Sequence, residues 1–189
     1  ISLKGKEEVN LEWGGKLVFI NSVVGGAIDT RFMPAILKGV MSRMEQGPLT
    51  GSYARDVRVI VYDGKMHPVD SNELSFKMAA SIAYKEGLKQ ANPVLLEPVG
   101  YLKVYVPESI MGDVIGDLNS RRGRIDAMED RDNGVKIITG FVPLANMFGY
   151  TSDLRGMSQG RANSTMEIHG YEEVPPNIAQ EIIEKRNSK

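Results

Sequence analysis

The second half of the chain contains six apolar segments in an order that few folds can accommodate. Four of them have the composition of β-strands, namely residues 101–106, 124–129, 135–142 and 162–169. The other two, residues 110–121 and 144–154, repeat their apolar side chains at helical spacing. The order strand, helix, strand, strand, helix, strand is that of the ferredoxin-like split βαβ arrangement. We therefore predict a ferredoxin-like βαββαβ domain over residues 98–189.

Single residues predict finer features of this domain. We expect Met147, Phe148 and Leu154 to face inward from the second helix. Gly123 is expected to adopt the left-handed conformation that ends the first helix. The sequence Asp132-Asn133-Gly134 favours a turn between the two middle strands. Pro175-Pro176 favours the start of a further helix near the end of the chain.

The first half of the chain predicts a separate domain of mixed strands and helices. Strands are expected at residues 16–24 and 56–62, and within residues 1–15. Residues 31–46 predict an amphipathic helix, because apolar side chains recur there every four positions. The chain is expected to divide at Pro98-Val99-Gly100, which gives an α+β protein with domains 1–97 and 98–189.

Residues 62–87 are the stretch in which a binding loop is best placed. Asp63-Gly64 favours a tight turn with positive φ after a strand. Asp70 and Glu73 have the spacing of a helix cap. The helix that follows is expected to bury the stripe of Leu74, Met78 and Ile82. A loop held between a strand end and a capped helix has a rigid base and an exposed tip, which suits a binding residue. The loop residues that we select as candidates are Lys65, Met66, His67, Pro68 and Asp70.

Composition excludes several classes of function. The formal net charge is −1, which lacks the positive excess of an autonomous nucleic-acid-binding domain. There are no cysteines, so disulfides and thiolate metal sites are excluded. No apolar run approaches the roughly 18 residues that a membrane helix needs. Neither Gly15-Lys16 nor Gly64-Lys65 is followed by the Ser or Thr of a phosphate-binding loop. No catalytic or metal-ligand pattern surrounds either histidine. The sequence therefore does not predict an enzyme. We expect a cytoplasmic protein with no membrane partner and no small-molecule substrate.

The chain resembles the fourth and fifth domains of bacterial elongation factor G, a translational GTPase. The resemblance begins with His67, the Val69-Asp70-Ser71 step and the acidic start of an alanine-rich helix. It continues through NPVLLEP, GDVIGDLNSRRGRI, VPLANMFGYTSDLR and GRANSTMEIHGYEEVP, in the order of the family. It implies a first domain similar to a ribosomal protein, with a βαβ unit, and a ferredoxin-like second domain. The chain has no initiating Met, so we expect a fragment of a longer protein. We also expect this fragment to be monomeric.

The resemblance also implies a role and partners. The family promotes movement of tRNA and mRNA through the ribosome, and the tip of its fourth domain enters the decoding region at the A site. By that likeness His67 and its neighbours would contact ribosomal RNA or tRNA–mRNA. The sequence has Pro68 where the family commonly has Asp, and a second, glycine-rich tip loop of the family is missing from residues 1–15. GTP and Mg²⁺ would belong to an N-terminal domain outside this chain, which itself needs no cofactor.

Five arginines of the second domain are candidates for contact with large-subunit ribosomal RNA: Arg121, Arg122, Arg124, Arg155 and Arg161. All five also have a structural explanation: the first three cluster at a helix end, where cations are favoured by the negative end of the helix, and the same alternative applies to the last two, which flank a glycine-rich turn. Two alternatives to the elongation factor remain open. One is a ribosomal-protection or duplicated elongation-factor-G-like protein, and the other is a free-standing ferredoxin-like RNA-binding module.

Overall fold

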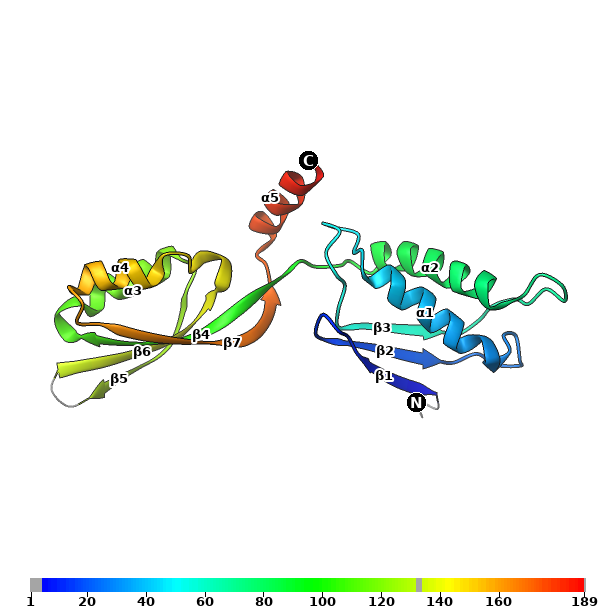
Figure 1. Ribbon diagram of the computed structural model, residues 1–189, viewed down its shortest axis with the longest axis horizontal. Helices are drawn as coiled ribbons and strands as arrows, with labels where there is room; N and C mark the ends of the chain where they lie inside the picture. Colours follow the sequence, from blue (N-terminus) through cyan, green and yellow to red (C-terminus); the bar gives the residue numbers. More distant parts are fainter. Residues whose placement is uncertain (1–4, 132–133, 189) are drawn as a thin grey trace. The chain divides into compact units, whose positions relative to one another are not determined.

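The chain folds into two compact units, each a sheet with helices packed on it (Figure 1). The structure is a computed structural model that describes residues 5–131 and 134–188. The first unit contains the chain up to Pro93 together with the residues from Gln180 onward, and the second contains Val94–Ala179. The predicted α+β class with two sheets is confirmed. Within the described residues, no helix is long and apolar enough to cross a membrane.

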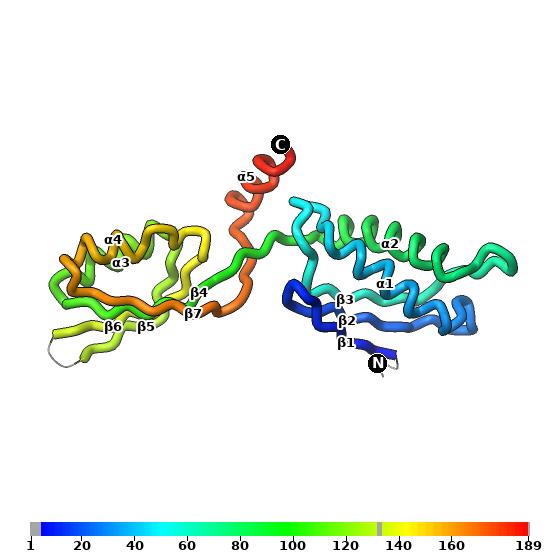
Figure 2. Tube along the Cα trace, in the orientation of Figure 1, coloured from blue at the N-terminus to red at the C-terminus, as the bar shows by residue number. Residues whose placement is uncertain are grey.

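The sheet of the first unit has three strands in the order β1-β2-β3. Strand β1 (Lys6–Asn10) runs antiparallel to β2 (Lys16–Asn21), and β3 (Val57–Val61) runs parallel to β2. Helix α1 (Met33–Met44) connects the two parallel strands, so the predicted βαβ unit is present. Helix α2 (Glu73–Gln90) follows β3 and lies with α1 on the same face of the sheet (Figures 1 and 2).

Helix α1 buries the face that its sequence predicts. Phe32, Ile36, Val40 and Met44 are all at most 5% exposed. They pack in two clusters that also contain Leu17 and Phe19 of β2. A short 3₁₀ turn, Thr30–Phe32, precedes the helix, and the carboxylate of Asp29 accepts a hydrogen bond from the Arg31 N–H to cap it.

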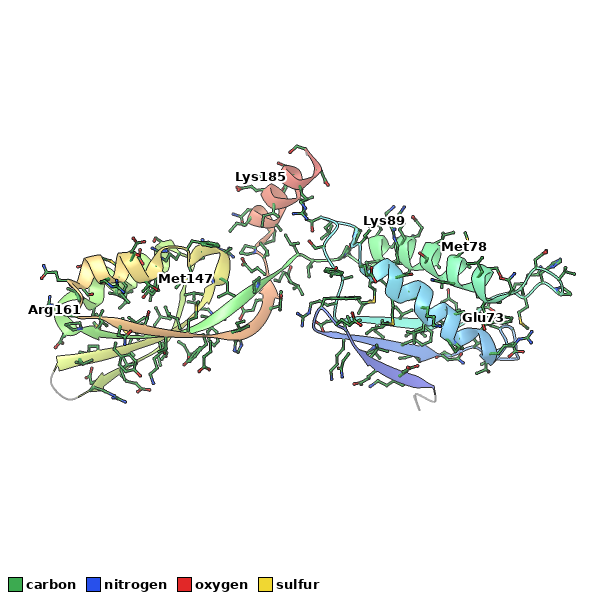
Figure 3. The ribbon with its side chains drawn as sticks, in the orientation of Figure 1. Glu73, Met78, Lys89, Met147, Arg161 and Lys185 are labelled. Atoms are coloured by element: carbon green, nitrogen blue, oxygen red, sulfur yellow. The ribbon has the colours of Figure 1, made fainter. Side chains whose placement is uncertain are left out.

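Helix α2 buries a different face from the one predicted. Leu74, Met78 and Ile82 are 66%, 57% and 63% exposed, so their predicted burial is wrong. Figure 3 shows Met78 on the outer side of the helix. The stripe that packs inward is Phe76, Ala80, Tyr84 and Leu88, which has the same four-residue spacing.

The cap of α2 also differs from the prediction. Asn72, rather than Asp70, is the N-cap, and its side chain accepts a hydrogen bond from the Ser75 N–H at 2.9 Å. The Ser75 hydroxyl reciprocates by accepting from the Asn72 N–H at 3.0 Å, which completes a capping box. Glu73 is instead the first helical residue, where its charge complements the helix dipole (Figure 3).

The second unit has the predicted ferredoxin-like fold. Strands β4 (Leu96–Pro107), β5 (Arg124–Arg131), β6 (Val135–Pro143) and β7 (Asn163–Glu173) form one sheet in the order β5-β6-β4-β7. All neighbouring strands are antiparallel. Helices α3 (Met111–Ser120) and α4 (Tyr150–Ser158) contribute Val114, Leu118 and Leu154 to a core with the inner side chains of β4 and β6. Helix α5 (Pro176–Asn187) begins at the predicted proline pair.

Three local predictions for the second unit need correction. Phe148 is 87% exposed instead of buried, because α4 begins only at Tyr150, after Gly149 with φ +76°. The left-handed residue after α3 is Arg122, with φ 63°, and not Gly123. Pro98-Val99-Gly100 lies within strand β4 and is not a linker.

Two further predictions for this unit are not settled. The compact units separate between Pro93 and Val94, and whether residues 1–97 and 98–189 fold as independent domains stays a prediction. The predicted turn at Asp132-Asn133-Gly134 includes residues 132 and 133, which lie outside the described part of the chain.

Candidate functional site

The candidate tip loop, residues 62–71, follows the carboxyl end of β3 and extends beyond the sheet where α2 begins (Figure 1). Because β2 runs parallel to β3, the β2–α1 loop, residues 22–29, leaves the same end of the sheet. The Ser22 N–H donates to the Val61 carbonyl at 2.8 Å, and the Asp29 N–H donates to the Met66 sulfur at 3.3 Å. The two loops therefore form one end surface.

His67 organises the tip loop through both its backbone and its ring. Its N–H donates to the Ser71 hydroxyl at 2.7 Å, and its carbonyl accepts from the Ser71 N–H at 3.3 Å. Its ring Nδ1 accepts from the N–H groups of Val69 and Asp70, each at 3.3 Å. Pro68 stands in the turn that these bonds close, where its fixed φ stiffens the chain.

These bonds determine how the imidazole of His67 faces its surroundings. An Nδ1 that accepts two N–H groups requires the tautomer with its proton on Nε2. The His67 side chain is 65% exposed, and its hydrogen bonds within the described chain use only Nδ1. The Asp70 carboxylate lies 3.1 Å from Nδ1. In the neutral state the loop presents Nε2–H as an exposed donor on a fixed ring.

The base of the loop is shaped by close packing, not by the predicted turn. Asp63-Gly64 does not form the tight turn that we expected, and Gly64 is not among the residues with positive φ. A Cβ at Gly64 would lie 2.4 Å from the Cδ1 of Ile28, a buried residue of the β2–α1 loop. A larger residue at position 64 would therefore require the Ile28 side chain to shift.

All five predicted tip residues lie on this one exposed loop, and the structure adds others. Val69 is 82% exposed at the turn, and Val24 is 79% exposed on the neighbouring loop, beside Gly25 and Gly26, which both have positive φ. The Val-Val-Gly-Gly sequence after a strand was a signal for this second loop. Its place beside His67 depends on the parallel pairing of β2 and β3, which the βαβ unit of the family resemblance implied but no local sequence pattern did.

The predicted arginines of the second unit fall into two groups, and Arg121 belongs to the group engaged within the fold. Its side chain is only 13% exposed and pairs with Asp117 at 2.8 Å and with Asp153. It also donates to the carbonyls of Asn146, at 3.1 Å, and Phe148, at 3.3 Å. The hydrogen bond to Asp117 is the largest contribution that raises the pKa of Arg121. Arg121 thus joins α3 to the loop before α4.

Arg122 and Arg124 also form ion pairs within the unit. Arg122 forms a bidentate pair with Glu97 of β4, and Arg124 forms one with Glu172 of β7 at 3.1 and 3.2 Å. Hydrogen bonding to Glu172 raises the pKa of Arg124. The Arg124 guanidinium lies 5.1 Å from the centre of the Phe141 ring.

Arg155 and Arg161 form the second, more exposed group. Both lie near the Gln159-Gly160 turn between α4 and β7, and Figure 3 shows Arg161 there. Arg161 donates from Nε to the carbonyl of Ser158 at 3.3 Å. Within residues 5–131 and 134–188, neither Arg155 nor Arg161 forms an ion pair with a carboxylate. The five arginines therefore do not form one site.

Comparison with known proteins assigns both units to one family. Residues 5–92 match the family model of elongation factor G, domain IV, and residues 94–182 match that of the elongation factor G C-terminus. A crystal structure of a protein from Thermus thermophilus is similar, with 35% identity and a TM-score of 0.82. That alignment covers 98% of the present chain but 30% of the Thermus chain. The chain therefore belongs to the elongation factor G family, as its resemblance predicts, and carries domain IV and the C-terminal domain.

Proposed function

We propose that this chain is the ribosome-binding C-terminal part of a translation elongation factor that promotes GTP-dependent movement of tRNA and mRNA. In this proposal the tip loop enters the decoding region at the A site. GTP and Mg²⁺ are bound by another domain of the whole protein, and the present part contributes contacts with RNA. Membership of the family supports the general assignment.

The observation that carries the specific role of the tip is the anchoring of His67. Four hydrogen bonds between His67 and residues 69–71 fix a loop whose side chains are otherwise exposed. A fixed imidazole with an exposed Nε2–H can donate to a ribose or phosphate oxygen, or stack on an unpaired base. Because the ring is already ordered, little conformational entropy is lost when it makes such a contact.

His67→Ala in the intact factor tests the proposal. Loss of one or two hydrogen bonds or of a stacking contact should remove about 1–3 kcal/mol. This corresponds to a roughly five- to hundredfold slower translocation if the contact forms mainly in the transition state. Ribosome-stimulated GTP hydrolysis should stay nearly unchanged, because the nucleotide lies on a different domain. Both rates are measured by rapid mixing on the same preparation.

His169→Ala is the matched control, since His169 is the other histidine and lies on β7 of the second unit. The translocation rate of the His169→Ala variant should remain close to that of the unchanged protein. The role assigned to His67 is wrong if its replacement slows hydrolysis and translocation equally, or slows neither. The same assay separates a translocase from the ribosomal-protection alternative, because a protection protein would not move tRNA.

For contact with large-subunit ribosomal RNA, the geometry favours Arg155 and Arg161 over the other three arginines. Arg121, Arg122 and Arg124 are each bound by carboxylates of their own unit, and an RNA phosphate would have to displace these partners. The exposed pair at the α4–β7 turn has no such competitor among the described residues.

A further inference from the structure

The first unit contains a pocket of about 310 Å³ at the end of α2 opposite the tip loop. It lies where the last turn of α1, the loop after it and the last two turns of α2 meet. This volume is at the lower end of the range for small-ligand sites. None of the tip residues lines it, so the pocket is separate from the proposed RNA contact.

The charged residues that line the pocket are all positive. They are Arg43 from α1, and Lys85 and Lys89 from α2. Lys89 also forms an ion pair at 3.3 Å with Glu86, which does not line the pocket. Both helices end here, and each helix dipole places about half a negative charge at its C-terminus. Two half charges offset only part of three cations, so the pocket keeps a positive balance.

Two polar groups of residues that line the pocket have no hydrogen-bond partner in the described part of the chain. Tyr84 is only 7% exposed, and its hydroxyl forms no hydrogen bond with the described residues. The Nε of Arg43 is also buried without an acceptor. Burial raises the pKa of Tyr84 to about 12, so its hydroxyl keeps its proton at neutral pH and remains a donor. Buried polar groups are normally paired, so each of these two lining residues leaves one donor without its usual acceptor.

The wall formed by the loop after α1 is already fixed by backbone bonds. The Gly47 N–H donates to the Ser52 carbonyl at 2.7 Å, and the Gly51 N–H donates to the Gly47 carbonyl at 3.2 Å. A Cβ at Gly47 would lie 2.5 Å from the Ser52 carbonyl oxygen, so only glycine allows this closure. A ligand would therefore enter a preformed site and would not have to order the loop.

We propose that this pocket binds the phosphate or pyrophosphate group of a small ligand. The phosphoryl oxygens supply the acceptors that Tyr84 and Arg43 lack, and the two lysines balance their charge. Pro48 and Leu88 give the same pocket an apolar wall for the rest of such a molecule. This site does not depend on the translocation role of the tip.

Calorimetric titration of the 189-residue chain with sodium pyrophosphate tests the proposal at constant ionic strength. We expect saturable one-site binding. Tyr84→Phe keeps the packing of the ring but removes the hydroxyl, and should weaken binding about tenfold, as for one lost hydrogen bond to a charged group. Arg43→Lys keeps the charge without the Nε donor and should also weaken binding, although less than Arg43→Gln.

Lys77→Gln is the matched control for Lys85→Gln, because Lys77 is exposed on the same helix but does not line the pocket. Lys85→Gln should weaken pyrophosphate binding several-fold and Lys77→Gln should leave it unchanged. The circular dichroism melting curve of each variant verifies that it is folded. Equal effects of the two lysine variants, or a titration without saturation, would show only general charge screening and would overturn the proposal.

Discussion

Arg121 connects several segments of the second unit through one side chain. It contacts two carboxylates and two backbone carbonyls, and its guanidinium lies 5.3 Å from the centre of the Tyr150 ring. These partners come from α3, from α4 and from the loop between β6 and α4. The Arg121 side chain is only 13% exposed and makes all these contacts, so it is part of the fold. The run of arginines around it nevertheless resembles an RNA-binding cluster.

Arg121→Ala should therefore destabilise the protein by about 2–4 kcal/mol, because it leaves Asp117 without its cation and removes the donors to the loop carbonyls. Arg155→Ala, which removes an exposed charge from the same unit, should cost less than about 0.5 kcal/mol. Urea unfolding monitored by circular dichroism measures both free energies. Similar values for the two variants would mean that the Arg121 contacts contribute no net stability.

The same residues show which local features the sequence can predict. The end of α3 could be predicted to within a residue, but Gly123 was assigned the left-handed conformation that Arg122 adopts. Gly123 is required for another reason, since a Cβ there would lie 2.8 Å from the Leu118 carbonyl oxygen. The side chain of the left-handed Arg122 forms a bidentate pair with Glu97, a contact between distant segments that no local pattern reveals.

Among the elements, α2 offers the clearest test of a local interaction. Asn72→Ala removes the capping box and should destabilise the first unit by about 1 kcal/mol. Asp70→Ala, at the position that the sequence favours as the cap, should cost less, because the Asp70 side chain is 81% exposed and lies beside the exposed His67 ring. Thermal unfolding of the two variants, compared with the unchanged chain, gives the ranking. A larger loss for Asp70→Ala would contradict the observed cap.

Helix α2 also shows why periodicity alone fails for some elements. Its sequence carries two apolar stripes of four-residue spacing, one through Leu74, Met78 and Ile82 and the other through Phe76 and Tyr84. Both satisfy the helical pattern equally well. Packing against α1 determines which of the two stripes is buried. The two helices lie so close together that a Cβ at Gly39 would lie 2.2 Å from the Lys77 carbonyl oxygen. Phe76 then stacks on Phe32 with ring centres 4.4 Å apart.

At the scale of the whole molecule, we expect the two compact units to unfold separately. Asn72→Ala should speed amide hydrogen exchange within residues 5–93, and Arg121→Ala should speed it within residues 94–179, because each substitution breaks contacts inside one unit only. Exchange measured by mass spectrometry on both variants locates the effect. Faster exchange in both units after either substitution would show a single cooperative unit instead.

The architecture of the second unit was predictable because its fold follows from the order of six segments, each with a clear period. The architecture of the first unit was less predictable from the sequence. Its strands and α1 could be predicted, whereas the neighbourhood of the tip depends on which strands pair and in which direction. Single residues therefore identified the His67 loop but not the Val24 loop beside it.

The close approach of Gly64 to Ile28, which the absence of a Cβ allows, has a mechanical consequence for the tip. Because Ile28 occupies the space of a Cβ at this position, the His67 loop cannot move toward the sheet without pressing on Ile28. Ile28 packs in the same cluster as Phe19, Phe32 and Ile36. Movement of the loop toward Ile28 would therefore also press on this part of the hydrophobic core. This contact gives the tip low compliance in that direction, which is the property that the proposed contact with another molecule requires.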